Sequence, residues 1–189
     1  MSTRRVAQTI ILIAMVVALS PFFIPLGPAK IFPFQHMANV IAAVLLGPWY
    51  AVVMATCTAI VRLSLGLGTV FAFPGGMIGA FLAGWAYRWV KSLRAGSPPP
   101  EIEADTETTS LPYRLARALP PEAYGAALGE IIGTGIIGAA VSAMIVDPLL
   151  VKKGAGLAFF IAIFSPSTIG GSIIGLFCLW VLRRAGYWK

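Results

Sequence analysis

Long stretches without charge make up most of this chain, and short segments rich in proline, glycine or charged residues separate them. Four of these stretches contain no Asp, Glu, Lys or Arg: residues 6–29, 31–61, 63–87 and 154–182. A fifth, residues 123–146, contains only Glu130. About 20 predominantly apolar residues are enough for a helix to cross a bilayer, and a cleaved signal peptide would explain only the first stretch. The pattern predicts an integral membrane protein with several spanning helices.

Helix-breaking residues divide these stretches further. Ser20-Pro21 ends the first helix, and Gly47-Pro48 splits the stretch 31–61, which is too long for a single span. The prediction is an all-α bundle that forms a single transmembrane domain over residues 1–189. Its six expected spans are residues 5–19, 35–46, 49–65, 75–93, 122–146 and 157–183.

Three apolar segments between the predicted helices are expected to be loops: residues 21–34, 66–74 and 147–156. The first is apolar but too rich in proline and glycine for a regular helix. Irregular backbone at membrane depth persists only where protein covers it or where it lines a cavity. We therefore expect residues 21–34 to fold back over the bundle.

The basic residues set the expected orientation. With the N-terminus inside, the cytoplasmic side holds ten of them: Arg4, Arg5, Arg88, Lys91, Arg94, Arg114, Arg117, Arg183, Arg184 and Lys189. The outer side then holds Lys30, Lys152 and Lys153, with Arg62 near the outer end of its helix. Because basic residues gather on the cytoplasmic side, both termini are predicted to be cytoplasmic. The three apolar loops would meet on the outer face of the cell membrane.

The overall composition excludes a water-soluble domain. Apolar residues make up 58% of the chain, charged residues 11%, and the mean hydropathy is +0.86, whereas soluble domains are about 25% charged. The net charge of +7 is explained by the cytoplasmic basic residues and does not indicate nucleic-acid binding. Residues 94–121 alone look soluble. They contain an acidic tract over 97–110 and are expected to be a mostly disordered cytoplasmic linker, with a short surface helix over 111–119.

Glu130 is the most informative single residue, because an acid at membrane depth is costly and usually points into a cavity or towards a partner. Thr134 follows one turn later on the same helix face. The structural alternative is that Glu130 only makes a hydrogen bond to a neighbouring helix.

Three polar residues, Gln35, His36 and Asn39, begin the short helix predicted over 35–46, and they resemble the wall of a polar pocket. Helix capping and interfacial solvation are the alternative for His36. No second His or paired Cys stands at ligand spacing, so no metal site is expected. Lys30 and Arg62 could lie near the pocket mouth, although such side chains more often extend to lipid headgroups.

Small residues recur at a spacing of four, which lets helices approach closely. Internal packing is the expected role of most of them: Ala72, Gly76, Ala80 and Gly84, then Gly125, Gly129 and Gly133, then Gly171 and Gly175. In the first helix Ala14 and Ala18 form the same pattern, with Ala7 one heptad earlier. This face could pack internally or meet a partner.

Five motifs, in order along the chain, resemble the ThiW family, the substrate-binding S components of energy-coupling factor (ECF) vitamin transporters. They are Gly27-Pro28-Ala29-Lys30, Pro33-Phe34-Gln35-His36-Met37 with Asn39-Val40, Leu45-Leu46-Gly47-Pro48-Trp49-Tyr50-Ala51, Gly68-Thr69 with Ala72-Phe73-Pro74-Gly75, and Gly129-Glu130-Ile131-Ile132-Gly133-Thr134-Gly135. The resemblance covers nearly the whole chain except the linker, which is longer and more acidic than the family leads one to expect.

The resemblance implies the six-helix S-component fold and binding of hydroxyethylthiazole, the thiazole precursor of thiamin. Energy would come from a separate module of two ATPases and a transmembrane T subunit. The substrate would lie near the outer face, with these expected contacts: Gln35, His36, Asn39, Phe73, Glu130 and Thr134. Phe73 is expected to stack on the thiazole ring, and Ala14 and Ala18 to dock the T subunit.

Two other classes of function stay open. A stand-alone channel or proton-coupled carrier would use Glu130 and His36 as a proton relay, but the chain has no inverted repeat and few charges within its predicted spans. A membrane enzyme or assembly factor is the third class. No Gly-x-x-x-x-Gly-Lys-Ser/Thr loop, Ser/His/Asp set or His-Glu-x-x-His motif supports it. We expect no enzyme activity and no cofactor.

Overall fold

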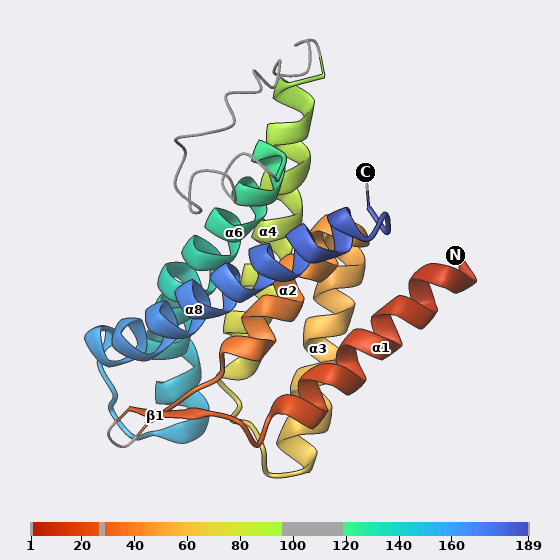
Figure 1. Ribbon diagram of the computed structural model, residues 1–189. Helices are drawn as coiled ribbons and strands as arrows, with labels where there is room; N and C mark the ends of the chain where they lie inside the picture. Colours follow the sequence, from red (N-terminus) through yellow and green to blue (C-terminus); the bar gives the residue numbers. More distant parts are fainter. Residues whose placement is uncertain (1, 27–28, 96–118, 189) are drawn as a thin grey trace.

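The computed structural model describes residues 2–26, 29–95 and 119–188, and nearly all of them are helical (Figure 1). Five helices have the following bounds: α1 Thr3–Leu19, α2 Pro33–Leu45, α3 Pro48–Ser64, α4 Ala72–Leu93 and α8 Leu157–Arg184. Between α4 and α8 a sixth helical segment runs without a break through α6 Pro121–Ile132, η1 Gly133–Gly138, α7 Ala139–Val141 and η2 Ser142–Val151. The described residues therefore agree with the all-α prediction, apart from one short hairpin. The predicted linker and its short helix lie mostly on residues 96–118, outside the described residues.

Proline starts three of these helices, as the sequence suggested for α3. Pro33, Pro48 and Pro121 occupy the first turns of α2, α3 and α6, where a missing backbone N–H costs nothing because no partner exists within the helix. Gly47 joins α2 to α3 with φ 92, in the left-handed region that favours glycine. The predicted break at Gly47-Pro48 is confirmed.

Two helices extend beyond their predicted bounds. α4 begins at Ala72, so Pro74 lies inside its first turn and the predicted loop over 66–74 is shorter than expected. The fifth predicted span does not end at residue 146 but continues to Val151, because the backbone around Pro148 keeps a helical course as a π-helix. Lys152, with φ 56, ends that helix. The predicted loop over 147–156 was therefore wrong in its first half.

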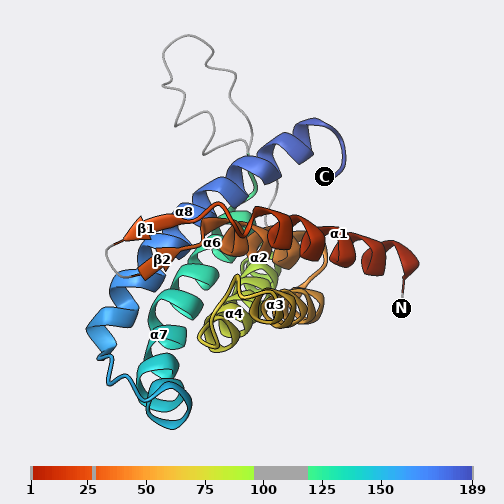
Figure 2. The same ribbon diagram turned by 90° about the horizontal axis from the view of Figure 1, so that it is seen from below.

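The proline-rich segment 21–34 contains a small exception to the all-α prediction. β1 Ile24–Leu26 and β2 Ala29–Ile31 form an antiparallel hairpin, in which Pro25 lies opposite Lys30. The hairpin folds back onto the helices, and β2 packs against α8 (Figure 2). A hydrogen bond of 3.0 Å from the Phe32 backbone N–H to the Ser167 hydroxyl fastens its end to α8.

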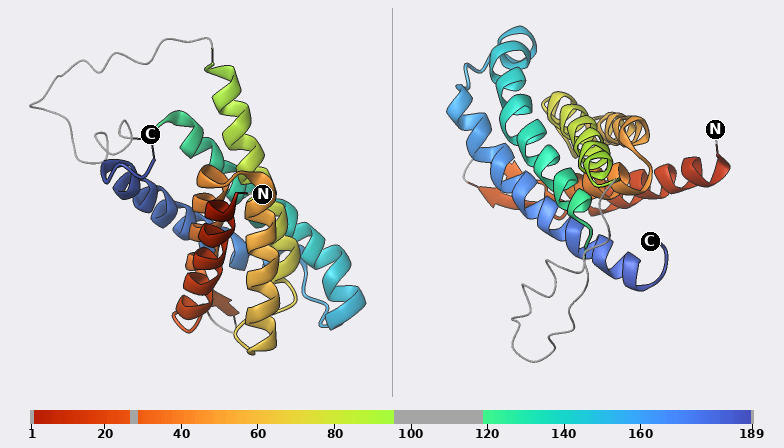
Figure 3. Two further views of the ribbon diagram at one scale, coloured as in Figure 1. Left: turned by 90° about the vertical axis from the view of Figure 1, so that its right-hand side faces the viewer. Right: turned by 90° about the horizontal axis from the view of Figure 1, so that it is seen from above.

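α2 is the central helix of the bundle. Of its residues only Phe34 and Leu45 are not buried, and the helix packs against α8, α4, α3, α6 and α1. Its polar side chains Gln35, His36 and Asn39 are buried as well, so the whole circumference of the helix is enclosed by others. α1, in contrast, lies at the edge, where it contacts α3 and α2 and its N-terminal end projects away (Figure 3).

Glycines bring α4 and the helix 121–151 close together. A Cβ atom added at Gly133 would lie 2.7 Å from the Gly79 Cα, and one added at Gly138 would lie 2.7 Å from the Gly75 Cα. The expected internal packing of small residues is thus confirmed for these helices. Ala14 and Ala18 of α1 differ, since both are exposed.

Among the described residues, two helical segments are long and apolar enough to cross a membrane: residues 121–151, with a mean hydropathy of 1.9, and α8, with 1.8. Only 33% and 28% of their most apolar windows are buried, so most of their apolar side chains face outward. Surfaces of this kind mark contact with lipid or protein. α1, α2 and α3 are shorter, with 17, 13 and 17 residues.

Candidate functional site

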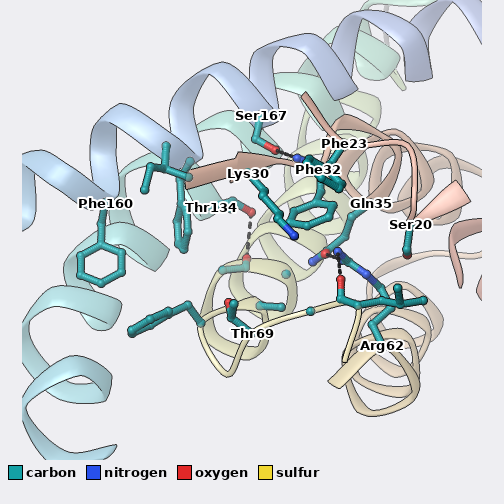
Figure 4. Close-up of a pocket in the computed structure, with 18 of the residues that line it drawn as sticks. Ser20, Phe23, Lys30, Phe32, Gln35, Arg62, Thr69, Thr134, Phe160 and Ser167 are labelled. Carbon is teal, nitrogen blue, oxygen red and sulfur yellow. Dashed lines mark hydrogen bonds between the residues drawn. The ribbon is translucent and has the colours of Figure 1, made fainter. Parts of the chain in front are cut away.

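A cavity of about 560 Å³ is lined by residues of the hairpin, of the α3–α4 connection and of the η2–α8 connection (Figure 4). Figure 1 shows these three connections at one end of the bundle. The volume lies within the range of small-molecule sites, about 300–1,000 Å³. The wall is largely apolar and contains six phenylalanines: Phe23, Phe32, Phe71, Phe159, Phe160 and Phe164.

The phenylalanines of α8 and of the α3–α4 connection form one continuous wall. Phe160 lies edge-on to Phe71, with ring centroids 4.8 Å apart, and to Phe164, at 5.9 Å. Such edge-to-face pairs leave flat ring surfaces available to a planar ligand. Phe73, the aromatic residue expected from the sequence, is half-buried and does not line the cavity, whereas Phe71 does.

A hydrogen-bond network under the cavity floor joins four of the expected site residues. Glu130 is fully buried, and its Oε1 accepts hydrogen bonds from His36 Nδ1 at 2.7 Å and from Asn39 Nδ2 at 3.0 Å. Thr134 Oγ1 lies 3.0 Å from the same Oε1 and 2.8 Å from the Gly75 carbonyl oxygen, to which it can also donate. Residues far apart in sequence, on α2 and on the helix 121–151, are thus brought to one point.

The members of this network differ in their access to the cavity. His36 and Thr134 line it, whereas Glu130 and Asn39 lie behind them. Both N–H groups of Asn39 are used, one by Glu130 and one by the Gly76 carbonyl oxygen at 3.2 Å. The hydrogen bond of the His36 ring to a described residue is made through Nδ1, which leaves Nε2 for another partner. With Nδ1 bonded to Glu130, the ring presents Nε2 as the polar atom for a ligand.

Arg62 lies at the cavity, which the sequence suggested as the less frequent of two alternatives. Its side chain does not extend towards lipid, as was the more frequent alternative, but is buried in the cavity wall, 1% exposed. The guanidinium donates to Gln35 Oε1 and, at 3.2 Å, to the Leu67 carbonyl oxygen, and it covers the Phe32 ring at 4.3 Å. Gln35 therefore lines the cavity, as expected, but together with a cation.

Asp147 is a second cavity residue that sequence reasoning missed, because it was assigned to a loop. It is buried, and its carboxylate accepts the backbone N–H of Ala155 at 2.9 Å and of Lys153 at 3.4 Å. These bonds fix the turn between η2 and α8. The helical continuation through Pro148 is what brings Asp147 to the cavity.

The site contains no metal-binding set: among the residues that the structure describes, no three His, Cys, Asp or Glu side chains are grouped so as to hold a metal ion. What the arrangement offers is a mostly apolar enclosure with a few fixed polar atoms, which is typical of a small-molecule site.

Comparison with known protein families agrees with this picture. The family described as "Thiamine-precursor transporter protein (ThiW)" matches residues 6–97 and 108–185, and leaves out the acidic part of the linker. Neither a curated protein nor a solved structure matches the chain. Since the match covers most of the chain, and the long apolar helices fit a membrane protein, the chain belongs to the ThiW family of thiamine-precursor transporter proteins.

Proposed function

We propose that this chain is the substrate-binding S component of an ECF-type transporter and that it binds hydroxyethylthiazole at the outer face of the cell membrane. The observation that carries the proposal is the cavity of about 560 Å³ above the Glu130–His36 network, in a chain of a thiamine-precursor transporter family. The chain would bind the ligand, and a partner module would supply the energy of ATP hydrolysis.

The ligand is small, aromatic and neutral, with a ring nitrogen and one hydroxyl group. Its ring fits against the phenylalanine wall of Phe71, Phe160 and Phe164, where dispersion and edge-to-face contacts favour a planar heterocycle. His36 Nε2 is the group proposed to bond the ring nitrogen or the hydroxyl. Thr134 is a further polar contact. Glu130 and Asn39 act through His36, because they hold its ring in place from behind.

The proposed topology has six membrane crossings. The helices run alternately between the two ends of the bundle, so that the N-terminus and the C-terminus lie towards the same end, away from the cavity (Figure 1). With the basic termini in the cytoplasm, the cavity opens to the outside. α2, with 13 residues, is the shortest of these helices and would cross only part of the bilayer thickness, enclosed by its neighbours α8, α4, α3, α6 and α1.

The proposed partners are a transmembrane T subunit and two ATPases. α1 is the helix proposed for docking. Its main contacts are with α3 and α2, and its small residues Ala7, Ala14 and Ala18 are exposed on one face with Ile11. Small residues in register permit a close approach of a second helix within a membrane.

Calorimetry on the purified chain in lipid nanodiscs tests the proposal, with hydroxyethylthiazole, thiamin and riboflavin as ligands. The expected result is binding of hydroxyethylthiazole at micromolar concentration or tighter, and weaker or no binding of the other two. Absence of hydroxyethylthiazole binding at micromolar concentration would overturn the substrate assignment. Uptake into liposomes by the chain alone, without ATPases, would favour the proton-coupled carrier instead.

A further inference from the structure

Arg62 is a buried cation without an anionic partner in the described part of the chain. It lies in the last turn of α3, is 1% exposed, and lines the cavity. The ion pairs among the described residues are His36–Glu130 and Arg94–Glu122, and neither involves Arg62. Buried charges in proteins are normally paired, because removing an ion from water is costly. The cavity therefore contains a cation that has no anionic partner among the described residues.

The guanidinium is held in place, yet most of its hydrogen-bonding capacity is unused. Of its five N–H donors, the described residues accept from only two nitrogens: Gln35 Oε1 bonds one terminal nitrogen and the Leu67 carbonyl oxygen bonds the other. Nε has no partner among the described residues. Phe32 supports one face of the group at 4.3 Å. Nε is itself enclosed by protein, so the N–H groups left for a ligand are those of the two terminal nitrogens, which can bind an oxyanion through charge-assisted hydrogen bonds.

A second cation lines the same cavity as Arg62. Lys30 of β2 lines the same cavity, with Nζ 4.3 Å from the Phe23 ring centroid, and its amine points into the space between Thr134 and Gln35 (Figure 4). Lys153 also lines the cavity, and Asp147 is the one acid among the lining residues. Three cations less one anion leave a charge of +2 on the wall, before any contribution of the His36–Glu130 pair.

We propose that the cavity selects ligands that carry an anionic oxygen group, a phosphate monoester or a carboxylate, and that Arg62 and Lys30 bind this group. The inference rests on the proposed function, which assigns the heterocycle to the phenylalanine wall and to His36. Figure 4 shows Phe160 at one side of the cavity and Arg62 with Gln35 at the other. A ligand with a ring at one end and an anion at the other would fill both sides and complete the missing ion pair.

A neutral hydroxyl group satisfies this end of the cavity poorly. It bonds one or two of the free N–H donors and leaves the guanidinium charge unpaired in a largely apolar enclosure. An oxyanion bonds several donors at once, and charge-assisted bonds of this kind are about twice as strong as neutral ones. We therefore expect the cavity to bind an anion more tightly than a neutral alcohol with the same ring, and this difference in affinity can be measured.

Calorimetry in nanodiscs tests this with three compounds that share one ring: hydroxyethylthiazole, its phosphate monoester, and the acid in which the hydroxyl-bearing carbon is oxidised to a carboxylate. We expect one or both anions to bind at least about tenfold more tightly than the alcohol. In Arg62→Gln the ratio of anion to alcohol affinity should fall towards one, and Arg62→Lys should retain part of it. Arg88→Gln, which removes an exposed arginine of α4, is the matched control and should keep the wild-type ratio.

The affinities of the three compounds decide whether the cavity prefers an anionic ligand. Preference for only one anion would identify which oxyanion the cavity binds. Binding of the alcohol as tightly as both anions in the wild-type chain would overturn this inference while leaving the proposed function intact, and so would an unchanged ratio in Arg62→Gln. Binding of none of the three compounds would overturn the proposed function as well. If Arg62→Gln fails to fold, the wild-type ratio and its fall in Lys30→Gln, which removes the second cation, give the answer.

Discussion

His36 of α2 and Glu130 of α6 meet in the interior of the bundle, with His36 Nδ1 2.7 Å from Glu130 Oε1 and the carboxyl group fully buried. Asn39 and Thr134 lie within hydrogen-bond distance of the same oxygen. The carboxyl group therefore joins α2 to the helix 121–151 and at the same time fixes a ring that faces the cavity. Stability and ligand binding depend on the same atoms here.

Removing the charge of Glu130 should weaken ligand binding. In Glu130→Gln one amide oxygen must replace a carboxylate that serves up to three donors, so the His36 ring loses its fixed orientation. We expect an affinity loss of about tenfold or more, and a larger loss with lower thermal stability in Glu130→Ala. Calorimetry and thermal unfolding in nanodiscs measure both. Glu122→Gln, which removes only the distant ion pair with Arg94, should bind normally; unchanged affinity in Glu130→Ala would remove Glu130 from the site.

The two residues should also act as a unit. If Glu130 contributes to binding by orienting His36, then His36→Ala and Glu130→Ala each remove the same contact, and the double variant should lose less affinity than the sum of the single losses. The coupling free energy expected for groups in one network is about 0.5–3 kcal/mol. A double-mutant cycle by calorimetry provides this number, and strict additivity would mean that the two side chains act separately.

Gly79 tests how tightly the network is enclosed. A Cβ atom at this position would overlap Thr134 Oγ1 and lie 2.6 Å from Glu130 Oε2. Gly79→Ala should therefore separate α4 from the helix 121–151, with a destabilisation of about 1–3 kcal/mol and weaker ligand binding. Gly170→Ala in α8 is the control, since its nearest neighbour, the Pro33 Cβ, would be at an ordinary 3.9 Å. Equal stability of the two variants would contradict the packing described.

The aromatic wall gives a test of which phenylalanine contacts the ligand. Phe71 and Phe160 line the cavity and Phe73 does not. Phe71→Ala and Phe160→Ala should each reduce affinity for the thiazole by about tenfold or more, because they remove a ring face together with its buried area. Phe73→Ala should have a smaller effect. If calorimetry showed a larger affinity loss in Phe73→Ala than in Phe71→Ala and Phe160→Ala, Phe73 and not these residues would be the ligand contact.

The exposed face of α1 should matter for assembly and not for ligand binding. Ala14→Trp and Ala18→Trp introduce side chains too large for a close helix contact, so co-purification with the T subunit and ATPases should be lost while thiazole binding persists. Leu128→Trp places an equally large side chain on the exposed face of α6 and should leave the complex intact. Assembly of both alanine variants would exclude this face as the docking surface.

Polar residues in apolar stretches were what made most of the site visible in the sequence. Gln35, His36, Asn39 and Glu130 stand out because each is costly where it lies, and Thr134 was found from its spacing to Glu130. The helix ends at Ser20-Pro21 and Gly47-Pro48 were equally visible, since proline and glycine act locally.

The site residues that could not be predicted from the sequence are those whose position depends on tertiary structure. Phe71 and Phe160 belong to a chain with many aromatic residues, and no local signal separates a cavity residue from one that faces outward. The burial of Arg62 depends on contacts with Phe32, Gln35 and Leu67, which only the tertiary structure brings around it. Asp147 was missed because a π-helix that continues through a proline contradicts the usual rule for helix ends.

The glycine contacts between α4 and the helix 121–151 have a mechanical consequence. Where Gly75 meets Gly138 and Gly79 meets Gly133, backbone lies against backbone, and no side chain is present whose rotation could absorb a sliding motion. These two helices carry the floor of the ligand cavity, and we expect them to move together. The main contacts of α1 are with α3 and α2, which lie outside that pair. If α1 docks the proposed partner, the docking helix and the helices under the ligand are separate, so docking should leave the shape of the cavity floor unchanged.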